Sequence, residues 1–386
     1  MANILDYLDW RGDVPFSVEP FNEVDGLILA EFGYLPLDGV VPSDFSVRIL
    51  LRHAYERYQN QLLVDEERPV IFEQDLVLFE KMAKSKRFRN TQITGYRSTK
   101  STQAELQFSA VTFVLDDGKG FVAYRGTDGS VIGWKEDFNL SYMQQTGAQL
   151  YALNYLNENQ GRFPQYLRVG GHSKGGNLAV YASAFCLPVI RSRIIQVFTY
   201  DGPGFREEIV ETEQYKSILP RISSYIPESS VIGLLLNNDI AHVIVKSAVS
   251  GLMQHFAYNW EVQRNKFVQA EELSRSGAVI NQALSGWLDE MNDDERKHLV
   301  QAIFDVISAS DQETFQEINK HKRTSYTGML KAVRKLAPEQ QKLVLDSIVK
   351  VAKNSKDAIL ADGSKSRKEM SEIKKAKERE EQADNV

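Results

Sequence analysis

The sequence predicts an α/β protein in which a mostly parallel β-sheet is covered by helices. Between residues 106 and 226, short runs rich in apolar and β-branched residues alternate with segments of helical periodicity. This alternation is typical of parallel strands joined by crossover helices. A glycine-rich turn at residues 170–176 joins one of these runs to a helix, and after about residue 262 only helical patterns remain. We therefore expect one α/β body followed by a helical appendage.

Composition is that of an ordinary globular protein. Of the 386 residues, 42% are hydrophobic and 25% are charged. A net charge of −6 gives no basis for nucleic acid binding. The single cysteine, Cys186, cannot form an internal disulfide, and the opening MANILDYLDWRGD does not resemble a signal peptide. No run approaches the roughly 18 apolar residues of a membrane span, so we expect a cytoplasmic protein whose membrane contact, if any, is peripheral.

Individual elements follow from the same patterns. Residues 1 to about 90 predict an N-terminal helical layer, with helices over Asn22–Leu29 and Ser43–Asn60. A hairpin follows, because β-rich runs flank the turn Asp116-Asp117-Gly118-Lys119. The predicted strands are Leu106–Leu115, Gly120–Arg125, Tyr166–Gly171, Ile195–Tyr200 and Arg221–Ile226.

The chain divides into three predicted segments. Residues 1–262 form the α/β domain together with its N-terminal layer, and residues 263–360 form a helical appendage. Apolar residues at helical spacing mark this appendage, Ser310 with Glu313 resembles a capping box, and Pro338 suits a helix start. Residues 361–386 carry many charges of both signs and almost no apolar residues, which predicts a solvated helix or a disordered tail.

The glycine-rich turn reads V-G-G-H-S-K-G-G and contains the pattern G-x-S-x-G around Ser173. A strand-like run enters it and a helical pattern leaves it, which is the context of a nucleophile elbow. Gly171 and Gly175 would let the strand and the helix approach closely. The alternative is a glycine loop that closes a structural turn or holds a phosphate, but neither G-K-[ST] nor G-x-G-x-x-G occurs here. We expect an α/β-hydrolase fold with a mostly parallel sheet, an N-terminal helical layer and a C-terminal helical appendage.

A serine nucleophile needs a general base, and the chain order of this fold places the base after the serine. Among His242, His255, His298 and His321, we favour His255, which lies in a turn-like stretch just after the last strand. His242 begins an apolar run and suits a core or edge position. His298 and His321 lie on polar faces of the appendage. His172 neighbours the serine, and because adjacent side chains of an elbow diverge, we expect it to pack or to orient the turn.

The acid must follow Ser173 and end a strand. Glu228, after R-I-S-S-Y-I-P, fits best, while Asp201 and Asp239 remain alternatives. Donors for a developing oxyanion are expected from the amide of Lys174 and from Thr127, where the run F-V-A-Y-R-G-T-D ends.

Three segments together resemble the class 3 (fungal-type) lipase family in content, order and spacing. They are A-Y-R-G-T-D, G-H-S-K-G-G-N-L-A and F-T-Y-D-G-P-G-F, within residues 90–260. The stretches W-R-G-D-V-P-F and Q-H-F-A-Y-N-W also resemble a group of bacterial lipase-like proteins with a domain of unknown function. The resemblance implies Ser173 as nucleophile, Thr127 and Lys174 as oxyanion donors and His255 as base. Glu228, or Asp239 in its place, corresponds to the acid, and Lys174 departs from the usual leucine.

The expected function is hydrolysis of carboxylic esters through an acyl-enzyme, with a small-molecule or lipid ester as substrate and no metal or cofactor. Lipids and phospholipids fall within this class. Val131–Trp134 and Val231–Leu236 are candidates for an acyl pocket or a lid, or simple core. The charge of Lys174 either pairs with Glu136 or Asp137 or recognises an anionic substrate group. The alternative function is that of a catalytically silent scaffold or interaction protein.

Overall fold

The computed structural model describes residues 1–62, 72–237, 239–274, 277, 291–310, 312, 322–334, 336 and 341. Several predictions fall outside these residues: Glu313 of the capping box, the helix start at Pro338, His321 and the tail over residues 361–386.

An eight-stranded sheet forms the centre of the molecule, with the strands in sequential order from β1 to β8. Strands β1 to β4 pair antiparallel, and β4 to β8 pair parallel. The five predicted strands are confirmed as β3 to β7, with no end shifted by more than one residue. The strands are β1 (Ile49–Leu50), β2 (Gln92–Ser101), β3 (Leu106–Val114), β4 (Gly120–Tyr124), β5 (Leu167–His172), β6 (Ile194–Tyr200), β7 (Ile222–Pro227) and β8 (His242–Val245).

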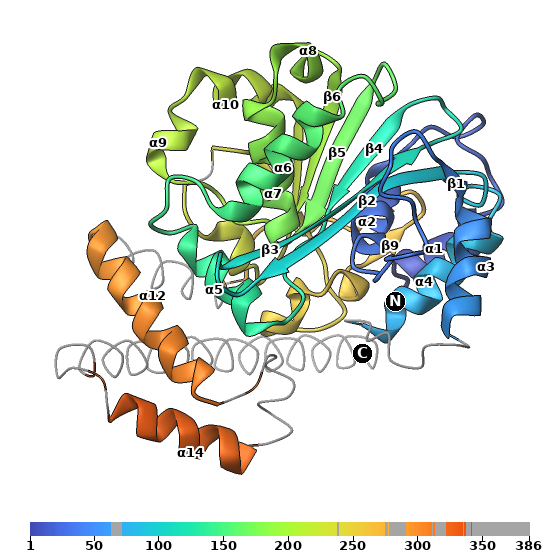
Figure 1. The fold of residues 1–386 in the computed structure, drawn as a ribbon. Coiled ribbons are helices and arrows are strands. Elements are labelled where there is room, and N and C mark those ends of the chain that lie inside the picture. The colour runs from blue at the N-terminus through green and yellow to red at the C-terminus, as the bar shows by residue number, and fades with distance from the viewer. Residues whose placement is uncertain are drawn as a thin grey trace, which may run out of the picture.

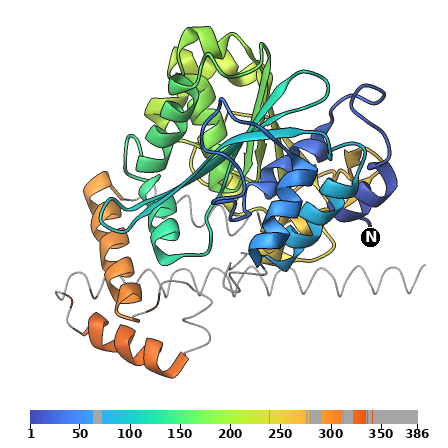
Figure 2. The same ribbon diagram turned by 45° about the vertical axis from the view of Figure 1, so that its right-hand side comes forward.

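The N-terminal helices cover one face of this sheet (Figures 1 and 2). They are α1 (Ile4–Arg11), α2 (Glu23–Phe32), α3 (Leu51–Leu62) and α4 (Glu73–Lys84). Helix α2 begins with a capping box, in which the Asn22 side chain accepts from the amides of Val24 and Asp25. It is buried along almost its whole length, and it contacts β4, β5 and β6. The predicted N-terminal layer therefore packs directly behind the strands that carry the elbow.

One predicted helix in this layer is shorter than expected. The sequence pattern predicted a helix over Ser43–Asn60, but α3 begins at Leu51. The Asp44 carboxylate accepts hydrogen bonds from the amide and hydroxyl of Ser46, which forms a local turn. Ile49 then pairs with Ile93 of β2. Because of this turn and the pairing of β1 with β2, residues 43–50 are not helical.

The opposite face is covered by the helices that connect the parallel strands (Figure 1). Their apolar residues pack with β3 to β6 into a second core, separate from the one beneath the N-terminal layer. Helix α7 contacts β4, β5 and β6, so the helix that follows the elbow lies against the centre of the sheet. These helices are α6 (Gly147–Glu158), α7 (Lys174–Phe185), α8 (Pro188–Arg191), α9 (Glu207–Val210) and α10 (Glu213–Ile218), followed by the 3₁₀ turn η1 (Leu219–Arg221).

Beyond β8 the chain forms short turns and a small hairpin before the appendage. Val262 and Phe267 of the hairpin lie in the core beneath the N-terminal layer, so the packed body continues to Phe267. These elements are η2 (Ile232–Leu234), which precedes β8, then η3 (Gly251–His255), η4 (Ala257–Asn259), β9 (Val262–Gln263) and β10 (Lys266–Phe267).

The described part of the appendage contains helices α12 (Asp293–Ser308) and α14 (Lys322–Val333). Val300 and Phe304 of α12 pack against Val131 of α5 (Val131–Asn139), and the rings of Phe304 and Phe138 lie 5.7 Å apart. The appendage is thus docked on α5, the helix that follows the Arg125-Gly126-Thr127 segment (Figure 1).

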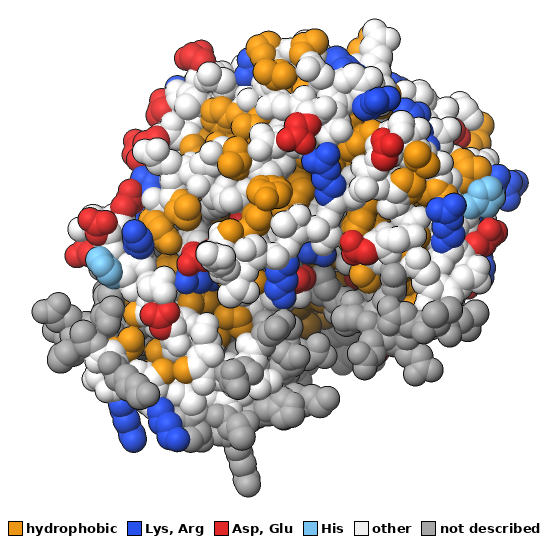
Figure 3. Space-filling view, viewed as in Figure 1, with side chains coloured by type: hydrophobic (Ala, Val, Ile, Leu, Met, Phe, Trp, Pro, Cys, Tyr) orange, Lys and Arg blue, Asp and Glu red, His pale blue; other side chains and the backbone are white. Residues whose placement is uncertain are grey.

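Surface charge is mixed on the face drawn in Figure 3, where lysine and arginine side chains are interspersed with aspartate and glutamate among the described residues. In the part of the chain that the structure describes, no helix has both the length and the apolar character needed to cross a membrane.

Candidate active site

Ser173 occupies a strained turn between β5 and α7. Its backbone angles are φ 56° and ψ −133°, outside the regions that non-glycine residues normally adopt. A β-carbon on Gly175 would meet the carbonyl oxygen of Tyr124 on β4, and one on Gly171 would meet the backbone of Gly175. Only glycine permits this approach of strand and helix. The local structure is therefore the strand–turn–helix elbow that the sequence predicted.

A histidine and a carboxylate line up behind the Ser173 hydroxyl. His255 Nε2 lies 3.0 Å from Ser173 Oγ, and His255 Nδ1 lies 2.6 Å from Asp201 Oδ2. Asp201 is 1% exposed, whereas the His255 side chain keeps 24% of its surface accessible. The arrangement is a serine, a partly exposed imidazole and a buried carboxylate in one hydrogen-bonded row, which is the geometry of a catalytic triad.

Asp201 is fixed from its other side as well. Its Oδ1 accepts hydrogen bonds from the Ser230 hydroxyl at 2.5 Å and from the Gly233 amide at 3.1 Å. The residue itself has a positive φ of 49°, directly after β6. Because one oxygen is held by Ser230 and Gly233, the other is left to orient His255.

The carboxylate beside His255 differs from the one that the sequence favoured. The sequence favoured Glu228, but the carboxylate bonded to His255 is Asp201, one of the two alternatives. Asp201 follows β6, which neighbours β5, whereas Glu228 follows β7, one strand further away. Strands are spaced about 4.8 Å apart, so the end of β6 is the nearer position for a group that must reach across to Ser173. Asp239 is exposed, and in the described residues no hydrogen bond joins it or Glu228 to His255.

In the described part of the chain, neither His242 nor His298 forms a hydrogen bond with Ser173. His242 begins the edge strand β8 and its Nδ1 lies 2.8 Å from the Ser224 hydroxyl. Burial lowers the pKa of His242. This agrees with the expected structural role at a sheet edge. His298 is exposed on α12.

Thr127 lies beside the elbow and is held there by Asp137. Thr127 Oγ1 donates a hydrogen bond of 2.5 Å to Asp137 Oδ2. A β-carbon on the preceding Gly126 would lie 3.1 Å from Ser173 Cβ, which places this strand end against the serine. In the described part of the chain the amides of Thr127 and Lys174 donate to no other protein group. Both are therefore available to a substrate oxygen, while the Thr127 hydroxyl is already engaged.

Comparison with known proteins identifies the family. The family model described as Mbeg1-like matches residues 82–305, more than half of the chain. The chain belongs to the Mbeg1-like family. Its sheet topology and elbow give it a lipase-like α/β-hydrolase fold. A solved structure described as the crystal structure of M37 lipase is similar at 13% identity and a TM-score of 0.35, over 55% of this chain and 69% of that one. No curated protein matches the sequence.

In this Mbeg1-like chain the side chain of Lys174 is buried against residues of β3 and α5. Lys174 Nζ lies 2.9 Å from Glu136 Oε2, and it donates to the carbonyl and side-chain oxygens of Gln107 at 3.0 and 3.2 Å. Both charged side chains are 1% exposed. The alternative in which Lys174 recognises an anionic substrate is therefore wrong, and pairing with Glu136 is confirmed.

Burial also affects the neighbouring Asp137. Desolvation raises the pKa of its carboxyl to about 6, although the Lys174 charge and the Thr127 hydrogen bond oppose the rise. At neutral pH Asp137 is therefore mainly ionised and accepts a hydrogen bond from the Thr127 hydroxyl.

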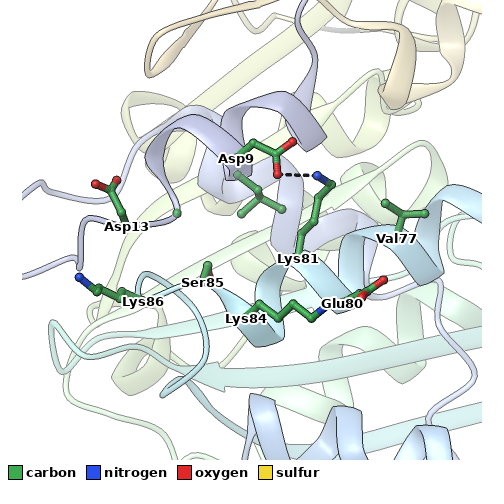
Figure 4. Close-up of a pocket in the computed structure, with 10 residues that line it drawn as sticks. Asp9, Asp13, Val77, Glu80, Lys81, Lys84, Ser85 and Lys86 are labelled. Atoms are coloured by element: carbon green, nitrogen blue, oxygen red, sulfur yellow. Dashed lines mark hydrogen bonds and ion pairs between the residues drawn. The ribbon is translucent and has the colours of Figure 1, made fainter.

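A hollow of about 530 Å³ lies at a distance from these residues, between α1 and α4 of the N-terminal layer (Figure 4). Lys81 pairs with Asp9 across it, and Lys84 pairs with Glu80 along α4. Both lysine charges are thus compensated by neighbouring carboxylates. Its other lining residues include Asp13, Val77, Ser85 and Lys86.

Proposed function

We propose that this Mbeg1-like chain is a serine hydrolase that cleaves carboxylic esters through an acyl-enzyme on Ser173. The observation that carries the proposal is the position of His255, 3.0 Å from the Ser173 hydroxyl and 2.6 Å from Asp201. A serine hydroxyl is weakly nucleophilic unless a base removes its proton, and a base works best when a third group fixes its ring. All three groups are present in the required order.

The chemistry follows from these contacts. His255 Nε2 takes the hydroxyl proton as Ser173 Oγ attacks the ester carbonyl carbon, and Asp201 stabilises the imidazolium that forms. The amides of Lys174 and Thr127 donate to the oxyanion of the tetrahedral intermediate. His255 then protonates the departing alcohol. Water, deprotonated by the same imidazole, attacks the acyl-enzyme and releases the carboxylic acid.

Apolar surface near His255 supports an ester with an apolar acyl group. Met253, two residues before His255, is 55% exposed. Turn η2, whose Gly233 amide donates to Asp201, contributes the half-buried Ile232 and Leu234. Val131 instead packs against α12, in the manner of a core residue. The substrate class that fits these apolar residues best is a lipid or phospholipid ester.

The direct test is hydrolysis of p-nitrophenyl butyrate and dodecanoate and of phospholipid vesicles by the purified chain. Ser173→Ala should abolish hydrolysis at an unchanged melting temperature. Asp201→Asn should lower kcat by about 10⁴-fold, because the His255 tautomer is no longer fixed. Glu228→Gln is the matched control and should change kcat by less than about twofold.

The outcomes separate the proposal from a silent scaffold. Loss of activity in Ser173→Ala and Asp201→Asn, but not in Glu228→Gln, supports the hydrolase. A folded wild-type chain that hydrolyses none of these esters, or a Ser173→Ala variant that retains the wild-type rate, contradicts it.

A further inference from the structure

A second histidine lies directly behind the triad and contacts its base. His172, the residue before Ser173, is 3% exposed and its Nε2 lies 2.8 Å from the main-chain oxygen of His255. The two imidazole rings are 4.7 Å apart between centroids, at an interplanar angle of 32°. The elbow directs His172 and Ser173 to different sides of the turn, so one residue contacts the base's main chain and the next contacts its ring.

The other side of the His172 ring meets the N-terminal layer. Its Nδ1 lies 3.1 Å from Glu31 Oε1 and 3.2 Å from the Tyr34 hydroxyl. Glu31 belongs to α2 and is 1% exposed. Among the described residues Glu31 Oε1 has no hydrogen-bond partner besides this ring, and a protonated imidazole there balances its charge. A buried carboxylate without a positive partner is costly.

These contacts favour the doubly protonated ring. The main-chain oxygen of His255 can only accept, so the Nε2 of His172 must carry a proton. The Glu31 carboxylate and the Tyr34 hydroxyl lie on the Nδ1 side of the ring. The Tyr34 hydroxyl can donate its hydrogen bond to the His172 carbonyl oxygen, 3.4 Å away. A neutral imidazole with its proton on Nε2 can accept the Tyr34 hydroxyl at Nδ1 but has no proton for Glu31, whereas an imidazolium donates both to the His255 oxygen and to the Glu31 carboxylate.

The charges around His172 agree with this state. Burial works against the imidazolium, but the charge and hydrogen bond of Glu31, the charge of Asp201 and the His255 carbonyl together raise the pKa of His172. Burial also raises the pKa of Asp75 on α4 to about 8, so this carboxyl is mainly neutral at pH 7. Among the described residues, the titratable groups that face or influence His172 are Glu31, Tyr34, Asp75, Asp201 and His255.

The segment that carries His255 needs such an anchor. It is a 3₁₀ turn, η3, that begins at Gly251 with φ +67° and includes the exposed Met253. Gln254 supplies one attachment, because its side chain accepts from the Ser229 amide at 2.7 Å and its carbonyl accepts from the Trp260 indole at 2.8 Å. The second attachment is the hydrogen bond from His172, on the elbow, to the main-chain oxygen of His255.

We propose that His172, held as an imidazolium by Glu31, is a positioning residue that fixes the main chain of His255 and thereby the distance between the base and Ser173. This inference rests on the proposed esterase function. It makes the N-terminal layer part of the catalytic apparatus, because Glu31 lies on α2. The ring does not contact substrate and transfers no proton in the reaction.

The activity test compares two double variants that leave no buried charge behind. Glu31→Gln/His172→Gln keeps an N–H donor for the His255 carbonyl, whereas Glu31→Gln/His172→Phe keeps a ring without a donor. The phenylalanine variant should have a kcat about a hundredfold lower than the glutamine variant, since a displacement of about 1 Å costs that much. KM should agree within about twofold. Equal kcat values in the two folded variants overturn the proposal.

The second test needs no activity. Nitrogen-15 NMR of histidine-labelled chain should show both ring nitrogens of His172 protonated at pH 7, and Glu31→Gln should return the ring to one proton. A neutral His172 at pH 7 in the wild type overturns the ion pair. If the wild type hydrolyses no ester and does not react with a fluorophosphonate, the proposed function itself fails. An active wild type with indistinguishable double variants refutes the positioning role alone.

Discussion

Replacing Lys174 by methionine tests whether the buried ion pair holds the elbow in place. The change keeps an unbranched chain of similar length and removes the charge together with contacts to Glu136 and to both Gln107 oxygens. Glu136 stays buried and keeps two backbone donors, the Gln107 amide at 3.0 Å and the Ala148 amide at 2.7 Å. Breaking a buried pair costs about 3–5 kcal/mol. Because these two amides still satisfy part of the carboxylate, we expect about 3 kcal/mol.

The assay is urea unfolding followed by circular dichroism, for Lys174→Met, Glu136→Gln and the double variant. Each single change should lower the free energy of unfolding, and the double variant should lose less than the sum by about 2 kcal/mol, since the groups form one network. A loss below about 1 kcal/mol in Lys174→Met would refute the reasoning. So would a KM that rises for anionic esters but not for neutral ones, since that would place the charge at the substrate.

Two further predictions concern residues near the site. Thr127→Val removes the hydroxyl that bonds to Asp137 but keeps the amide. Because the amide then loses its position, kcat on a p-nitrophenyl ester should fall about a hundredfold. An unchanged kcat would contradict this anchoring role. Asp75→Asn tests a buried acid whose pKa is raised to about 8, chiefly by burial. The unfolded chain loses this proton near pH 4, so wild-type stability relative to the variant should fall by about 1.4 kcal/mol per pH unit between about pH 4 and 8. Urea unfolding at pH 5, 6, 7 and 8 measures this difference, which should be constant if Asp75 is ionised throughout.

Much of the fold could be predicted because local pattern and tertiary environment agree. Strands β3 to β7 are rich in apolar and aromatic residues, and most of their positions are buried in the sheet. Strand β2 was not predicted, because its residues after Gly95 are largely polar, with Arg97, Lys100 and three serine or threonine residues. It forms because its backbone pairs with β3 along most of its length, with an irregularity between Thr94 and Arg97. Such pairing is a long-range contact that periodicity does not reveal.

The site residues were predictable where a motif constrains the backbone. They were less predictable where their proximity depends on the order of the strands in the sheet. The glycines around Ser173 indicate the elbow directly, and the turn-like stretch around His255 indicates a loop that returns to it. The acid depends on which neighbouring strand end is closest to the elbow. Chain order favoured Glu228 and left Asp201 and Asp239 as alternatives, because it does not reveal that distance. The contact between Glu31 and His172 joins residues 141 positions apart, and no local signal marks it.

Reaction of the folded chain with a fluorophosphonate, followed by mass spectrometry of its peptides, tests the central claim most directly. The probe forms an Oγ–P bond and releases fluoride only at a serine activated by a neighbouring base. We predict one adduct per chain, on the peptide that contains Ser173, with no labelling in Ser173→Ala and slow labelling in His255→Ala. A folded wild-type chain that stays unlabelled, or an adduct that persists in Ser173→Ala, would contradict the assignment of Ser173 as the nucleophile.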